Sequence, residues 1–180
     1  MNLKDFFMAK HFGASSGGDY EAMVAGLADR TITSLIIPTG VTNIATGAFA
    51  DCTDLQSVVI PDSVTAIGVN AFRGCAFQSV SIPPNLSLID QNVFAGCRNL
   101  QTVVIPIGVE EVRAQAFNNC TGLKIVTFKG TPTLSTLYGL YAFQGCTGIT
   151  DIYVPWAEGE VAGAPWGATN ATIHYNHTEG

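Results

Sequence analysis

The chain alternates apolar and polar positions in a pattern that returns about every 23 residues. One unit begins at Leu55, places apolar Val58 and Ile60 two positions apart, and then reaches Pro61. Residues two apart on a strand point to the same side, so the segment before Pro61 is predicted to form a short strand with one buried side. Proline has no N–H to donate to a neighbouring strand, so Pro61 is predicted to end this strand.

The aromatic and cysteine positions keep the same spacing. Successive phenylalanines lie 23, 22, 23 and 26 residues apart, and the cysteines follow them in the same register. The phenylalanines are Phe49, Phe72, Phe94, Phe117 and Phe143, and the cysteines are Cys52, Cys75, Cys97, Cys120 and Cys146. A unit of this size cannot bury its apolar residues alone, so the units are predicted to stack with Phe over Phe and Cys over Cys.

Two units depart from the common length. The link from Cys75 through Ala76 to Phe77 is one residue shorter than the link from Cys52 to Leu55. The fifth unit carries three extra residues within 129–140, which we expect to form an outward loop. Three leucines of this segment are expected to return beneath the loop, namely Leu134, Leu137 and Leu140.

The two ends of the repeat array are expected to be capped, because terminal units otherwise expose the core. Residues 1–18 form an N-terminal segment with a Gly/Ser linker, and residues 19–31 form a cap in which Asp19 begins a short helix over residues 20–27. Repeats occupy residues 32–154, and residues 155–180 form a C-terminal cap. Large apolar residues suited to this second cap are Trp156, Pro165, Trp166, Ile173 and Tyr175.

The pattern L-x-x-V-x-I-P-x-x-V-x-x-I-x-x-x-A-F-x-x-C resembles the BspA-type leucine-rich repeats of bacterial surface proteins, over roughly residues 32–154. This resemblance implies a leucine-rich-repeat solenoid, a right-handed superhelix of short parallel β-strands with irregular or short helical turns and about six coils. It also implies a cell-surface or extracellular setting and a role in adhesion, and it brings no catalytic residues. Many members have glycine after the second isoleucine. Here Gly68 matches, while Ala45, Asp90 and Arg113 stand at the equivalent places.

Composition excludes some partners. The net charge is −6 and the chain has no run of Lys or Arg, so nucleic-acid binding is not expected. No apolar run reaches the roughly 18 to 20 residues of a membrane span. The first 12 residues lack the unbroken apolar run of a secretory signal peptide, which leaves a cytoplasmic or phage-associated setting open.

No motif points to an enzyme, a metal or a cofactor. The cysteines lack the C-x-x-C spacing of zinc sites, so buried free thiols are favoured over a single labile disulfide pair. His174 and His177 are three apart, which on a strand places them on opposite faces and favours surface histidines over metal ligands. The carboxylate pairs are expected to be solvated rather than catalytic, namely Glu110 with Glu111 and Glu158 with Glu160.

Outward positions of the predicted strands would align into stripes on stacking. One stripe is largely apolar and consists of Ile36, Val59, Ser81, Val104, Thr127 and Tyr153. An uncharged, partly apolar sheet face often marks an interaction site, although β-branched residues also favour strands wherever they lie. The stripe is therefore a candidate binding site for a protein, a glycan or a second copy of the chain, with ordinary strand propensity as the alternative.

Three functions compete at this stage. The repeat pattern favours a non-enzymatic adhesion or recognition module at a bacterial surface. The missing signal peptide favours a structural or receptor-binding component of a prophage or tail-like assembly. A hydrolase on a solenoid scaffold would need acid residues that converge in a groove, and the sequence shows no such arrangement.

Overall fold

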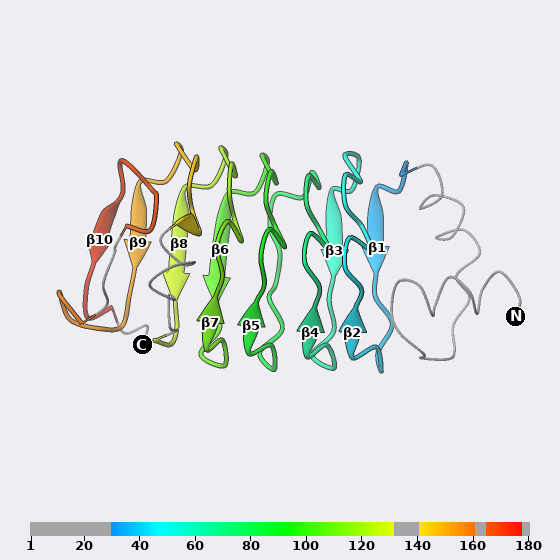
Figure 1. The fold of residues 1–180 in the computed structure, drawn as a ribbon, viewed down its shortest axis with the longest axis horizontal. Helices are drawn as coiled ribbons and strands as arrows, with labels where there is room; N and C mark the ends of the chain where they lie inside the picture. Colours follow the sequence, from blue (N-terminus) through cyan, green and yellow to red (C-terminus); the bar gives the residue numbers. More distant parts are fainter. Residues whose placement is uncertain (1–29, 132–140, 161–164, 178–180) are drawn as a thin grey trace, which may run out of the picture.

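The computed structural model describes residues 30–131, 141–160 and 165–177, which wind into a solenoid of parallel β-strands (Figure 1). We number its coils from the leucine position to the cysteine, so that coil 1 is 32–52, coil 2 is 55–75, coil 3 is 77–97, coil 4 is 100–120 and coil 5 is 123–146. Coil 6 begins at Ile149. This architecture confirms the predicted solenoid. The expected N-terminal helix and the three loop leucines lie outside the described residues.

The strands lie on two faces of the solenoid. The first face carries β1 (Ser34–Ile36), β3 (Ser57–Val59), β6 (Thr102–Ile105), β8 (Ile125–Phe128), β9 (Asp151–Tyr153) and β10 (Thr172–His174). The second face carries β2 (Asn43–Ile44), β4 (Ala66–Ile67), β5 (Leu88–Ile89) and β7 (Glu111–Val112). Figure 1 shows these as two rows of arrows that run in opposite directions. β10 pairs with β9, so the first face continues beyond residue 154, where the sequence had ended the repeats.

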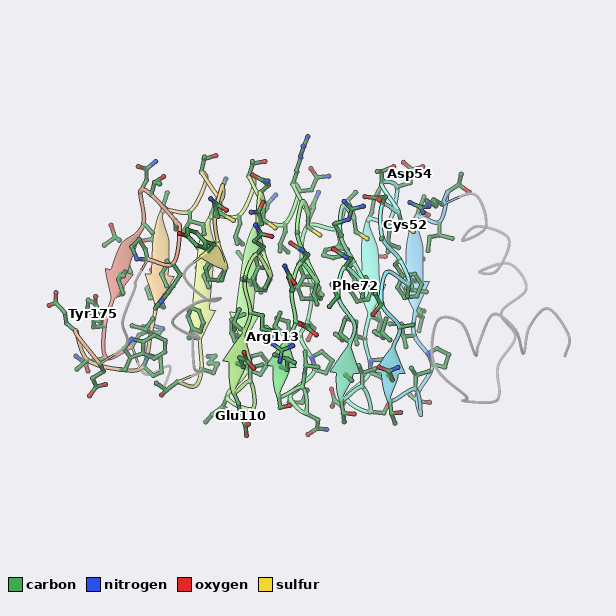
Figure 2. The ribbon with its side chains drawn as sticks, viewed as in Figure 1. Cys52, Asp54, Phe72, Glu110, Arg113 and Tyr175 are labelled. Atoms are coloured by element: carbon green, nitrogen blue, oxygen red, sulfur yellow. The ribbon has the colours of Figure 1, made fainter. Side chains whose placement is uncertain are left out.

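The phenylalanines stack through the centre of the solenoid as predicted. Ring centroids of neighbouring coils lie 5.3 to 5.9 Å apart, with planes within 15° of parallel. All five rings are buried, as Figure 2 shows for Phe72. Offset stacking at this spacing adds stabilisation to that gained by burying apolar area. The ring stack therefore stabilises the packing of each coil on the next.

The cysteines form a second column beside the rings. Each thiol of coils 2 to 5 donates a hydrogen bond to the phenylalanine carbonyl of the preceding coil, with Sγ to oxygen distances of 3.3, 3.2, 3.1 and 2.9 Å. The residue before each cysteine has φ between 58° and 76°. These residues are Asp51, Gly74, Gly96, Asn119 and Gly145. Glycine, asparagine and aspartate tolerate this left-handed conformation best. The position before each cysteine is therefore restricted to these residue types, a constraint that the sequence analysis missed.

The C-terminal end of the described core is closed by tryptophans. Trp156 and Trp166 are both buried, and each ring lies 5.5 Å from the ring of Phe128 in coil 5. The backbone carbonyl of Trp166 accepts the N–H of Phe143, which continues the coil-to-coil hydrogen bonding past the last phenylalanine. Figure 2 shows Tyr175 at this end of the molecule.

Candidate binding face

The sequence predicted an apolar stripe of outward residues on the first face. The N-terminal half of this stripe is exposed in the structure. Ile36 is 69% exposed, Val59 56% and Val104 45%. Ile36 stands directly beside Val59 in the parallel register of β1 and β3. Ser81 of coil 3 is also exposed. These four residues are called the stripe below. Exposure arises because the pleat sends alternate residues outward while Leu35 and Val103 point into the core.

Thr127 is an exception to the expected exposure. Its register places it between Val104 and Tyr153, but only 8% of its surface is accessible. Tyr153 is itself half-buried. A short threonine beside a tyrosine on the adjacent strand is shielded by the larger neighbour, and alternation along one strand cannot reveal this. The exposed stripe therefore ends near Val104.

The two histidines contact the same tyrosine. His174 stacks on Tyr153 with ring centroids 4.5 Å apart, and His177 lies against the same ring at 4.7 Å. The strand argument for opposite faces does not apply to His177, because β10 ends at His174 and the chain then turns at Asn176, whose φ is 55°. His174 Nε2 lies 2.7 Å from Asp151 Oδ1. The Thr150 hydroxyl and this histidine together lower the pKa of the Asp151 carboxyl. In the described part of the chain, no group of His, Cys, Asp and Glu side chains could hold a metal ion.

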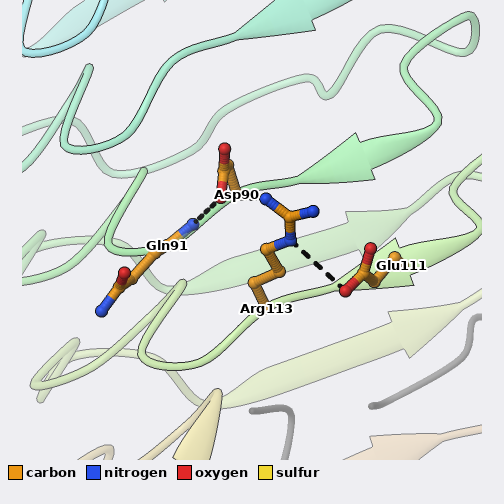
Figure 3. Close-up of polar contacts among 4 residues, drawn as sticks. All are labelled: Asp90, Gln91, Glu111 and Arg113. Carbon is orange, nitrogen blue, oxygen red and sulfur yellow. Dashed lines mark hydrogen bonds and ion pairs between the residues drawn. The ribbon is translucent and has the colours of Figure 1, made fainter.

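The Asp90 carboxylate takes part in a contact between coils. Arg113 Nη1 binds Asp90 Oδ1 of the preceding coil at 3.0 Å. Arg113 Nε binds Glu111 Oε1 of its own coil at 3.3 Å (Figure 3). Hydrogen bonds from Arg113, first to Asp90 and then to Glu111, raise the pKa of the guanidinium. Glu110 is exposed at the lower rim in Figure 2, away from this pair. Glu158 and Glu160 are exposed, and Glu160 accepts the N–H of Ala157 at 2.9 Å.

Comparison with known proteins identifies this arrangement. The family model described as BspA type Leucine rich repeat region matches residues 27–150 with six copies. The chain belongs to the BspA-type leucine-rich-repeat family. A crystal structure of a leucine-rich cell surface protein from Faecalibacterium prausnitzii is 30% identical, with a TM-score of 0.55, and the match covers 82% of this chain and 33% of that one. A leucine-rich repeat protein from T. pallidum is 25% identical with a TM-score of 0.54, and the match covers 68% of this chain and 72% of the other.

This BspA-type chain spans a third of the Faecalibacterium protein. No curated protein matches it. Repeats of this family are typically non-enzymatic protein-interaction scaffolds. Among the described residues, no helix is long and apolar enough to cross a membrane.

The thiols of this BspA-type chain lie in the core. All five cysteines are buried and free, as predicted. Burial raises the pKa of Cys75, and it raises the pKa of Cys97 to about 12. Thiolates are the reactive form of cysteine, so Cys75 and Cys97 stay protonated. All five cysteines act as small core residues.

We predict that native protein at pH 8 reacts with no equivalents of Ellman's reagent within minutes, because all five thiols are buried. The same protein unfolded in guanidinium should release five equivalents, one for each cysteine in the chain. Fewer than five equivalents after unfolding would reveal a disulfide and contradict the free-thiol column.

Proposed function

We propose that this chain is a non-enzymatic recognition module whose stripe binds a protein partner at a bacterial surface. The observation that carries the proposal is the exposure of three aliphatic side chains, Ile36, Val59 and Val104, on one face of the solenoid. Single apolar residues are common on surfaces, but three aliphatic side chains on the same face of a solenoid present a larger apolar contact area.

The chemistry of the stripe favours a protein as the occupant. None of its four residues is charged, and a sheet supplies a rigid surface that loses little entropy on binding. The centres of protein interfaces are depleted in charge and enriched in apolar contacts. Membership of a family of protein-interaction repeats points the same way.

The test is a double substitution, Val59→Lys with Val104→Lys. Burying two ammonium groups in an apolar contact without partners should weaken binding at least about 10-fold, because the charges must be desolvated. Ile107→Lys is the matched control, since Ile107 is 78% exposed but lies in the loop after β6, off the stripe. Surface proteins of the native host that bind immobilised wild-type chain would be purified, and their affinities for the three forms measured.

The proposal fails if no protein is retained specifically, or if the double variant binds each retained protein as tightly as wild type. It also fails if the loop control weakens binding equally. A concentration-dependent dimer that the double variant abolishes would replace the protein partner with a second copy of the chain.

We also propose a cell-surface setting with adhesion as the role. The Faecalibacterium relative is described as a cell surface protein, which supports this. Protease treatment of intact native cells should degrade the protein, because a surface-exposed chain is accessible. Protection in intact cells, or recovery only with sedimenting tail-like particles, would contradict the setting and favour the assembly component.

A further inference from the structure

No strand pairing joins coils 2 and 3 on either face of the solenoid. β1 pairs with β3 and β2 with β4, which join coils 1 and 2, whereas β5 pairs with β7 and residue 79 bridges residue 102, which join coils 3 and 4. Within residues 55–97, all of which the structure describes, no backbone hydrogen bond joins 57–59 to 79–82 or 66–67 to 88–89. Elsewhere on the first face, Ile37 donates to Val59 at 3.0 Å and Lys129 to Ile105 at 2.9 Å.

The two coils remain attached along the phenylalanine and cysteine side. There Phe72 donates its N–H to the carbonyl of Val93 at 3.0 Å, and Gly74 donates to Ala95 at 2.8 Å. The separation is therefore local to the strands. Its effect is visible at Val58, whose side chain is half-buried, whereas the inward residues of the neighbouring strands are fully buried.

The cause lies in the sequence of the link. The shortened link brings Phe77 to the position that leucine occupies in coil 2. Phe77 is fully buried and stands edge-on to Phe72 and Phe94, with centroid distances of 6.2 and 6.3 Å. Those two stacked rings lie 5.9 Å apart, compared with 5.3 Å for every other neighbouring pair of the stack. The larger side chain of Phe77 and the missing link residue thus keep the strands of coils 2 and 3 from pairing.

A hollow of about 870 Å³ lies over this junction. It is lined by hydroxyl side chains of coils 1 to 3, by the amides of Gln56, Gln78 and Asn99, and by the carboxylate of Asp54. Figure 2 places Asp54 at the upper rim, near Cys52. Small-molecule sites have volumes of about 300–1,000 Å³, so the hollow has a suitable size. Asn99 Nδ2 donates to the carbonyl of Ala76 at 3.2 Å and so holds the rim across the short link.

We propose that this hollow binds a neutral sugar residue. Hydroxyls and amides both donate and accept hydrogen bonds, which matches the hydroxyl groups of a saccharide. Among the described residues that line the hollow, none is lysine or arginine, and the net charge is −6, so a phosphate or other anion would be repelled. The site is independent of the protein partner proposed for the stripe.

The missing ladder adds main-chain partners. Where β-strands pair normally, their N–H and C=O groups are used by the neighbouring strand. At the junction, the groups of residues 57–59 and 79–82 that would face each other are left for a ligand or water. A polyhydroxylated molecule can satisfy such groups from any direction, whereas a peptide strand needs a regular edge.

The experiment uses the full chain and amide-detected NMR. The probes are the methyl glycosides of glucose, galactose, mannose and N-acetylglucosamine, together with maltose, lactose and chitobiose. At least one should shift the amide signals of Gln56, Ser57, Gln78 and Ser79 saturably. Glucose 6-phosphate and a neutral Gly-Ser peptide serve as comparators. No saturable shift from any saccharide, shifts that map elsewhere, or equal binding of the phosphate or the peptide would overturn the proposal.

Variants separate the hollow from the rest of the solenoid. Gln78→Ala should weaken binding of the responding sugar about 5-fold, the effect of one lost hydrogen bond. Gln101→Ala is the matched control, because Gln101 holds the same register in coil 4 but does not line the hollow. Insertion of threonine between Cys75 and Ala76 restores the common link length and should abolish binding. Unchanged affinity in Gln78→Ala, or an equal loss in Gln101→Ala, would refute the site whether or not the insertion variant folds.

Discussion

Replacing Phe94 with alanine is expected to lower the free energy of unfolding by about 3–5 kcal/mol. The ring is fully buried in the middle of the solenoid and contacts three others, at 5.9 Å from Phe72, 6.3 Å from Phe77 and 5.3 Å from Phe117. Truncation removes buried apolar area and leaves a cavity that stacked backbones on both sides cannot fill. Urea denaturation followed by circular dichroism would measure the change.

The control is Ile36→Ala, which also truncates a large apolar side chain. The surface of Ile36 is 69% exposed. Its cost should stay below about 1 kcal/mol, because surface substitutions remove little buried contact. A solenoid joins each coil only to its neighbours, so hydrogen exchange in the Phe94 variant should rise first in coils 2 to 4. A cost for Phe94→Ala as small as that of the control would mean that the ring stack does not hold the coils together.

The periodic part of this structure could be predicted from sequence because repetition removes ambiguity. A single Phe or Cys carries little information about its surroundings. Five of each in one register can all be buried only if the units lie on top of one another, as the ring stack and the thiol column do. The same reasoning located the outward positions Ile36, Val59 and Val104.

The non-periodic parts could not be predicted, because each depends on a three-dimensional neighbour. The shortened link at Ala76 was visible in the sequence, but its opening of the ladder depends on how Phe77 packs between two rings. Burial of Thr127 depends on the tyrosine of the next strand, and the contact of His177 with that tyrosine depends on a turn after β10. The polar hollow lies at the shortened link between coils 2 and 3.

Gly68→Ala is expected to destabilise the chain by about 3 kcal/mol, at the upper end of the usual cost of overpacking. A Cβ on Gly68 would lie 2.5 Å from the backbone nitrogen of Thr46 and 2.8 Å from its Cα. These are backbone atoms of the adjacent coil and cannot swing away as a flexible side chain would. Relief requires coils 1 and 2 to move apart, which strains the hydrogen bond from Gly68 N to the Ile44 carbonyl, now 2.8 Å.

The matched control for Gly68→Ala is Ala45→Ser, which also adds one heavy atom at the same register but in coil 1, where a Cβ is already accommodated. Thermal unfolding of both variants would measure the difference, and the serine variant should stay within about 0.5 kcal/mol of wild type. This contrast tests why glycine stands at this register in coil 2 although alanine, aspartate and arginine fill it in coils 1, 3 and 4. In coils 3 and 4 those side chains point outward, where Asp90 and Arg113 pair at 3.0 Å. If Gly68→Ala were as stable as wild type, the close approach of coils 1 and 2 would not be a packing constraint, and glycine at this register would have no steric reason.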